Sequence, residues 1–362
     1  MGELLYRYGP PALAWALFLS RRPGDDRARR CVRWVLLGLA VSLTALTPPV
    51  YAFVGNLSGI GHLARPIGHG GMLFAAWAAQ EFLASMNGLA RGARWHAWWV
   101  GGAFAVMCVL FALAPGLYPD EPGVLEYCVV YLLGQAPAFG NVIRLGLRYA
   151  RAAAAPALRI GMRLVVAGAA LALLYLVNKV VLTAAARFGF AYPAGDTFVI
   201  SKVLPAAAHV LVLVGATLPA IVGWARRYGH YQRLGPLWRA LYQAEPAIAL
   251  DPPAGPDVLR VRGLRLRLYR RVIEIRDGLL ALHPYREHDV AAAARRHATR
   301  AGMRGRRLEA TVEAAAVAAA LRVRAEGGPP SETAVPVTGG GDLDSDTAFL
   351  SEVARAYRKN LG

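Results

Sequence analysis

The sequence predicts an all-α protein: a polytopic membrane helix bundle of about seven transmembrane helices, followed by a small helical cytoplasmic domain at the carboxyl end. Three observations lead to this prediction: long apolar stretches, arginines concentrated in every second connection, and a change of composition after residue 223. Hydrophobic residues make up 56% of the 362 residues. A membrane-spanning helix needs about 20 mostly apolar residues. Seven stretches approach or meet that requirement, at about 4–19, 31–54, 68–89, 95–113, 127–143, 164–186 and 197–223.

The stretch at 4–19 is the weakest, because Arg7 and Pro10–Pro11 interrupt it. A secretory signal is the alternative, but no small-residue cleavage site follows the stretch. We therefore expect a retained span. Without it, six spans remain and the orientation of the later ones is unchanged.

The arginines predict how the chain is threaded through the bilayer. Six basic residues lie in 21–33, two in 91–94 and five in 144–163, whereas the intervening connections contain only Arg65 and Arg187. Short loops rich in Arg and Lys stay on the cytoplasmic side. We therefore expect a multi-pass protein of the inner (plasma) membrane with its amino terminus outside and its carboxyl terminus inside.

The net charge of +18 does not predict a nucleic-acid-binding protein. Residues 224–362 contain 23 basic and 15 acidic side chains, a balance of +8, but no groove-reading motif. A basic surface near the inner leaflet is attracted to anionic lipid. We also expect no catalytic centre, cofactor site or metal site, because no catalytic motif is present and the three cysteines lack metal-ligand spacing.

The part after the last span divides into three segments. Residues 224–242 predict a basic juxtamembrane helix with an apolar face. The prolines and glycine of 246–256 predict a linker, because proline cannot continue a helix. The domain organisation is therefore 1–223 for the membrane part, 224–256 for the juxtamembrane helix and linker, and 257–362 for the cytoplasmic domain.

Four helices are predicted in the cytoplasmic domain. The first begins near residue 264 and ends at Gly278, with Leu266, Tyr269, Ile273 and Leu280 at the spacing of one helical face. Helices over 290–303 and 308–323 follow, and the last covers 347–359. In the third, the predicted face consists of Leu308, Val312, Ala315, Ala319 and Val323, which either packs in the core or contacts a second copy of the chain.

The acidic run Asp342–Asp346 resembles the opening of a calcium loop, but Thr347 replaces the required glycine and Val353 replaces the last glutamate. We therefore expect these acids to cap the last helix.

The run Leu266–Tyr285, the alanine-rich helices and the closing Gly341–Asp342–Leu343 segment together resemble a family of actinobacterial multi-spanning integral membrane proteins that carry a transporter label. The resemblance implies a C-terminal cytoplasmic domain of unknown function. It implies no catalytic residue, substrate or cofactor.

Ionisable residues inside the spans are the best candidates for an intramembrane polar site, because each costs about 2.5–3.5 kcal/mol at a helix centre. Glu81 and His209 are expected near the midplane, where they could meet. Lys179 and Lys202 are expected nearer the outer rim, where Glu126 or Asp196 could pair with them. These residues form either an inter-helix polar clamp or a path for protons or ions.

Two functions follow from these features. The first is a secondary transporter or permease, favoured by the intramembrane polar residues and by prolines at 48–49, 137, 205 and 219 that interrupt spans. The alternative is a membrane-anchored signalling or scaffold protein whose tail binds a cytoplasmic protein. Candidate contact residues for such a partner lie in the first tail helix: Arg267, Arg270, Arg271, Glu274 and Arg276.

Overall fold

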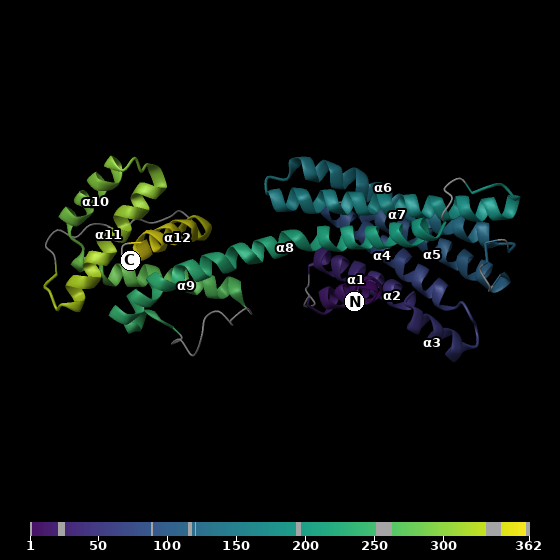
Figure 1. Cartoon of the computed structure of the whole chain (residues 1–362), viewed down its shortest axis with the longest axis horizontal. Coiled ribbons are helices and arrows are strands. Elements are labelled where there is room, and N and C mark those ends of the chain that lie inside the picture. Colours follow the sequence, from purple (N-terminus) through teal and green to yellow (C-terminus); the bar gives the residue numbers. More distant parts are fainter. Residues whose placement is uncertain are drawn as a thin grey trace. The chain divides into compact units, whose positions relative to one another are not determined.

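The computed structural model describes residues 2–20, 26–87, 90–114, 118–119, 121–192, 197–250, 263–330 and 342–359. All regular structure within these ranges is helical, in agreement with the predicted fold class (Figure 1). Contacts divide the chain into two compact units, Met1–Pro219 and Ala220–Gly362.

The first unit is a bundle of helices. Its helices are α1 (Gly2–Ser20), α2 (Arg27–Ala45), α3 (Pro48–Ser58), α4 (Ala64–Met86), α5 (Ala90–Leu113), α6 (Val124–Ala152), α7 (Pro156–Phe188) and the first part of α8 (Thr197–Ala244). Among the described residues, four helical segments are long and apolar enough to cross a membrane: Trp95–Leu113, Val124–Ala152, Pro156–Phe188 and Val203–Ala244. The pair α2–α3 makes a fifth if it counts as one broken span. The described residues therefore support a membrane protein with four or five such segments and do not confirm the predicted number of seven.

The stretch predicted as a single span at 31–54 is broken in the structure. α2 ends at Ala45, α3 begins at Pro48, and the two helices are bent by 77°. A proline ring clashes with the preceding turn but fits the first positions of a helix. Pro48 and Pro49 therefore start a new helix instead of continuing the first.

Pro137, by contrast, lies inside α6 without ending it. A proline removes the N–H that would bond to the carbonyl four residues earlier, here that of Leu133. The indole Nε1 of Trp99 in α5 donates to this carbonyl at 3.0 Å, and Gln80 Nε2 in α4 donates to the carbonyl of Pro137 at 2.8 Å. Side chains of neighbouring helices thus satisfy the backbone around the proline.

Two helix pairs of the bundle touch at glycines. A Cβ on Gly38 of α2 would lie 2.6 Å from the carbonyl oxygen of Gly71 in α4, and a Cβ on Gly161 of α7 would lie 2.6 Å from that of Gly215 in α8. Small residues allow membrane helices to approach this closely. Any larger residue would force these backbones apart.

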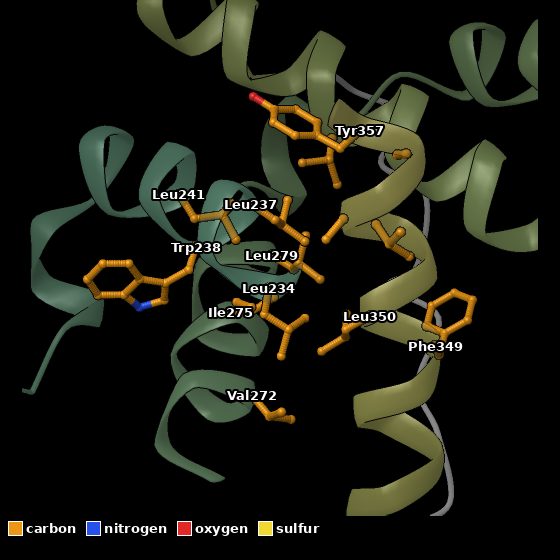
Figure 2. Packing of buried hydrophobic residues seen from close by; sticks show 14 of the residues in the cluster. Leu234, Leu237, Trp238, Leu241, Val272, Ile275, Leu279, Phe349, Leu350 and Tyr357 are labelled. Carbon is orange, nitrogen blue, oxygen red and sulfur yellow. The ribbon is translucent and has the colours of Figure 1, made fainter. Parts of the chain in front are cut away.

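The second unit has a hydrophobic core of its own. It consists of the last part of α8, η1 (Pro246–Ile248), α9 (Leu264–Ala281), η3 (His283–Tyr285), α10 (His288–Arg300), α11 (Gly305–Ala325) and α12 (Leu343–Lys359). Figure 2 shows the centre of this core, where side chains of α8, α9 and α12 meet: Leu234, Leu237 and Leu241, then Val272, Ile275 and Leu279, then Phe349, Leu350 and Tyr357. The segment 224–242, assigned from sequence to a separate juxtamembrane helix, therefore supplies part of this core.

Gly278 does not end α9, contrary to the prediction. The helix continues to Ala281, and Gly278 is buried. A Cβ at this position would lie 3.0 Å from Cβ of Leu241 and 3.2 Å from Cδ1 of Ile248. The glycine lets α9 pack closely on α8.

The predicted cap of the last helix is present. Asp342 Oδ1 accepts a hydrogen bond from the backbone N–H of Ser345 at 2.7 Å, and Ser345 Oγ accepts one from the N–H of Asp342 at 3.2 Å. The bond from Ser345 lowers the pKa of Asp342. This reciprocal arrangement is a capping box at the start of α12.

Candidate functional site

Glu81 lies near one end of the bundle, paired with an arginine. It is 8% exposed, and its Oε2 accepts a hydrogen bond from Nη2 of Arg27 at 2.8 Å. Arg27 is the first residue of α2, and Glu81 lies five residues before the end of α4 at Met86. His209, predicted as a neighbour of Glu81, instead bonds through Nδ1 to the carbonyl of Pro205 in its own helix. The structure thus brings Glu81 to Arg27, in the arginine-rich 21–33 segment.

His96 is a further residue at this end of the bundle that sequence reasoning missed. It is 8% exposed, and its Nε2 has no hydrogen-bond partner among the described atoms. The negative charge of Glu81 interacts with the imidazole ring of His96. The sequence offered one signal for it: His96 lies in the first turn of the apolar stretch that follows Arg94.

A second polar cluster joins α4, α6 and α7. Nδ1 of His69 and the hydroxyl of Tyr127 are 2.8 Å apart, and the His69 ring stacks on Tyr131 with centroids 4.3 Å apart. Lys179 Nζ lies 5.8 Å from the centroid of the Tyr175 ring, and the charges of Arg65 and Lys179 both act on His69. Tyr175 in turn interacts electrostatically with Tyr131. We call His69, Tyr127, Tyr131, Tyr175 and Lys179 the aromatic–lysine cluster.

Two buried amide groups lie on the helices α6 and α7 that contribute to the aromatic–lysine cluster. Gln135 lies one turn after Tyr131 and is 1% exposed; its side chain interacts with Tyr131, but neither its Nε2 nor its Oε1 makes a hydrogen bond of normal length among the described atoms. Asn178 precedes Lys179, and its buried Nδ2 also lacks such a partner, although its Oδ1 accepts a hydrogen bond from Tyr192. Buried polar groups are nearly always hydrogen-bonded. These unsatisfied atoms mark a place where a polar ligand would gain partners.

The predicted carboxylate partners of the lysines are otherwise engaged or not described. Glu126 pairs with Arg187 at 3.8 Å. Asp196 and the side chain of Lys202 lie outside the described part of the chain. No ion pair of Lys179 with a carboxylate occurs within the described ranges. Lys179 is thus a partly buried cation beside the Tyr175 ring.

Three of the five candidate contact residues in the tail are committed to its fold. Arg271 is 5% exposed and lies between two rings, 3.9 Å from the centroid of Tyr231 and 4.7 Å from that of Trp238. Glu274 accepts a hydrogen bond from Nε1 of Trp238 at 2.7 Å, and Arg276 contacts Asp346 of α12 at 2.6 Å. The other two, Arg267 and Arg270, are half-buried.

α9 is apolar on two sides. Its buried side faces the core, but Leu266, Tyr269, Ile273 and Leu280 on the other side are 56%, 46%, 39% and 66% exposed. We call these four residues the exposed stripe of α9. They are the face predicted from helical spacing, and the structure leaves them on the surface of the unit. The exposed stripe is therefore available to a partner.

Two ion pairs support the hairpin of α10 and α11. Arg286 and Glu313 form two hydrogen bonds of 2.9 and 2.7 Å, and their side chains are 2% and 4% exposed. Arg295 and Glu309 form the same two-bond arrangement at 2.8 and 2.6 Å, but their side chains are 50% and 39% exposed. Arg295 lowers the pKa of Glu309, chiefly through these hydrogen bonds. Neither pair was predicted from the sequence.

Within the described ranges, no three His, Cys, Asp or Glu side chains are grouped so that they could hold a metal ion. In a comparison with known protein families, residues 223–359 match a family of unknown function (DUF6545). No curated protein and no solved structure matches the chain. The match supports the predicted tail domain of unknown function. The transporter label and the actinobacterial origin remain predictions.

Proposed function

We propose that this chain is a secondary transporter or permease of the plasma membrane, with its amino terminus outside and its carboxyl tail inside. The orientation rests on the arginine-rich 21–33, 91–94 and 144–163 segments. The transport function rests on polar and ionisable side chains within the helices of the bundle, which are costly there and typically line substrate or ion paths.

The aromatic–lysine cluster is the observation that carries this proposal. Three helices contribute to it, and it lies toward the end of the bundle opposite Glu81: His69 is five residues after the start of α4, and Glu81 is five before its end. The separation of twelve positions corresponds to about 18 Å along a helix. Polar groups toward both ends of the bundle are what a path through it would need.

Glu81 and His96 supply a candidate proton site at the inner end. The carboxylate of Glu81 already accepts a hydrogen bond from Arg27, and the unpartnered Nε2 of His96 is buried within range of its charge. Imidazole changes charge near neutral pH more readily than any other side chain. In the proposed cycle, a proton carried by His96 and Glu81 couples to movement of the solute.

The test is transport by the full chain in proteoliposomes under an imposed pH gradient. A panel of organic anions, organic cations and amino acids is scanned for currents on a solid-supported membrane. We expect Glu81→Gln to abolish pH-driven current, and Glu126→Gln, the same change at an exposed position, to leave it intact. No current for any solute would remove the transport function. Unaltered flux in both Glu81→Gln and His209→Ala would remove these two residues from the pathway.

A second function, membrane-anchored signalling or scaffolding, is favoured by the exposed stripe of α9. Its apolar residues lie near Arg265 and Arg270, so it suits an amphipathic helix with acidic residues beside its apolar face. Two other outcomes compete with this one: binding of the exposed stripe to the anionic inner leaflet, and self-association of the second unit. The second unit has its own core, so residues 220–362 can be tested alone.

The discriminating experiment measures saturable binding of residues 220–362 to a cytoplasmic protein. Binding lost in Ile273→Asp but retained in Arg306→Asp would support the scaffold. Binding to anionic vesicles, or dimerisation, with no protein partner would replace it. Intact transport without any partner would favour the first function.

A further inference from the structure

We propose that the aromatic–lysine cluster binds a small organic carboxylate. This inference rests on the proposed transport function and adds the chemical class of the solute. It is drawn from the charge, the hydrogen-bonding capacity and the ring surfaces of residues contributed by α4, α6 and α7.

The charge of the cluster selects an anion. Lys179 contacts the Tyr175 ring and has no carboxylate at ion-pair distance within the described ranges. The nearby Glu126 is paired with Arg187. An ammonium group surrounded by apolar helices is costly without a counter-charge. A bound carboxylate would supply that counter-charge, whereas a cationic solute would be repelled.

The hydrogen-bonding groups select an oxygen-bearing ligand. The amide nitrogens of Gln135 and Asn178 are buried donors without partners among the described atoms. Each buried donor left unsatisfied costs about 1–3 kcal/mol. The hydroxyls of Tyr131 and Tyr175 can also donate. A carboxylate accepts up to four hydrogen bonds, so it could take one from Gln135, which lies beside Tyr131, and others from the tyrosine hydroxyls. A neutral amide of the same shape could not match the charge.

The rings of the cluster set the shape of the ligand. Arg65 of α4 adds a second positive charge that acts on His69, Tyr175 and Lys179 and also favours an anion. The stacked rings of His69 and Tyr131, 4.3 Å apart, and the ring of Tyr175 provide flat apolar surfaces beside the charge. A carboxylate attached to a small planar group therefore fits better than inorganic phosphate or sulfate.

The experiment measures thermal unfolding of the full chain in lipid nanodiscs with benzoate as the probe. Benzamide serves as the neutral probe of the same shape, and benzyltrimethylammonium as the cationic one. The variants are Lys179→Met, Lys179→Arg and Gln135→Leu. Lys359→Met is the matched control, because Lys359 is an exposed lysine in the last turn of α12.

We expect benzoate alone to raise the unfolding midpoint of the unmodified chain and of Lys359→Met. The apparent affinity should fall at least tenfold in Lys179→Met and in Gln135→Leu, and Lys179→Arg should retain most of it. If Lys179→Met does not fold, Gln135→Leu and the three probes on the unmodified chain still decide the result.

Three results would overturn the inference: no shift with benzoate, an equal shift with benzamide, or a benzoate shift that persists in both Lys179→Met and Gln135→Leu. Failure of transport is a separate outcome. Benzoate binding without any solute current would keep the carboxylate site and remove the transporter. Current with a cationic or neutral solute but without benzoate binding would keep the transporter and remove the carboxylate site.

Discussion

The two ion pairs of the α10–α11 hairpin allow a matched measurement of what burial does to a salt bridge. Arg286–Glu313 and Arg295–Glu309 have nearly the same two-bond geometry, but the first pair is 2% and 4% exposed and the second 50% and 39%. Removing one partner of a buried pair typically costs about 3–5 kcal/mol, because the remaining charge stays buried without a partner. An exposed pair contributes roughly 0–1 kcal/mol.

We therefore expect Arg286→Met to destabilise residues 220–362 by about 3–5 kcal/mol, and Arg295→Met by less than about 1 kcal/mol. A domain of ordinary stability has about 5–15 kcal/mol in total, so the first change could remove most of it. The double variant Arg286→Met/Glu313→Leu should recover much of the loss, since replacing a buried pair by apolar residues is often neutral or stabilising. Nε of Arg286 has no hydrogen-bond partner among the described atoms, so the double variant also removes an unsatisfied buried donor.

The assay is urea denaturation of residues 220–362, followed by circular dichroism, for the single and double variants of both pairs. The double-mutant cycle gives the coupling energy within each pair. Equal losses for Arg286→Met and Arg295→Met would refute the reasoning, because burial is the main difference between the two sites. A double variant no more stable than Arg286→Met would show that the loss comes from packing and not from a stranded charge.

Three further predictions concern the second unit. Gly278→Ala should cost about 1–3 kcal/mol in urea denaturation, because its Cβ would lie 3.0 Å from that of Leu241; an unchanged midpoint would show that α9 can shift. Asp342→Ala should speed hydrogen exchange in the first turn of α12, where the backbone N–H of Ser345 loses its acceptor, and unchanged exchange would contradict the cap. The lowered pKa of Glu309 means that its contribution to stability is full above the ordinary carboxyl pKa and is lost as the pH falls through the lowered value. An acid titration of residues 220–362 against Glu309→Gln should show this difference, below about 1 kcal/mol, and parallel curves would exclude it.

Apolar spacing predicted the helices of the tail better than it predicted their buried faces. The spacing of Leu266, Tyr269, Ile273 and Leu280 indicates a helical face, but α9 has a second apolar face of Leu268, Val272, Ile275 and Leu279, and this one is buried. A helix that is apolar on two sides gives no internal signal of which side meets the core. Only the positions of α8 and α12 decide it.

In α11 the difficulty is the alanine content. Of the predicted face, Val312 is buried, whereas Leu308, Ala315, Ala319 and Val323 are only partly buried. The most deeply buried positions include Ala314, Val317 and Ala320. Alanine at most positions removes the contrast on which a period depends.

The sequence predicts which residue types form the intramembrane site but not which residues contact one another there. Glu81 and Lys179 were identified because a charge inside an apolar stretch is costly. The partner of Glu81 is Arg27, which the sequence analysis treated only as a marker of orientation. His69 and the tyrosines of the aromatic–lysine cluster were missed, because in an apolar stretch such residues equally suit helix packing.

The glycine contacts determine which parts of the bundle can separate. In these two helix pairs backbone packs directly against backbone, so the helices cannot slide past each other in small steps. We therefore expect α2 with α4, and α7 with α8, each to move as one rigid pair. The contact between Arg27 and Glu81 lies within the first pair and would persist if the bundle opened. His69 and Lys179 belong to different pairs, so separation of the two pairs would move the two sides of the aromatic–lysine cluster apart and let a bound molecule leave.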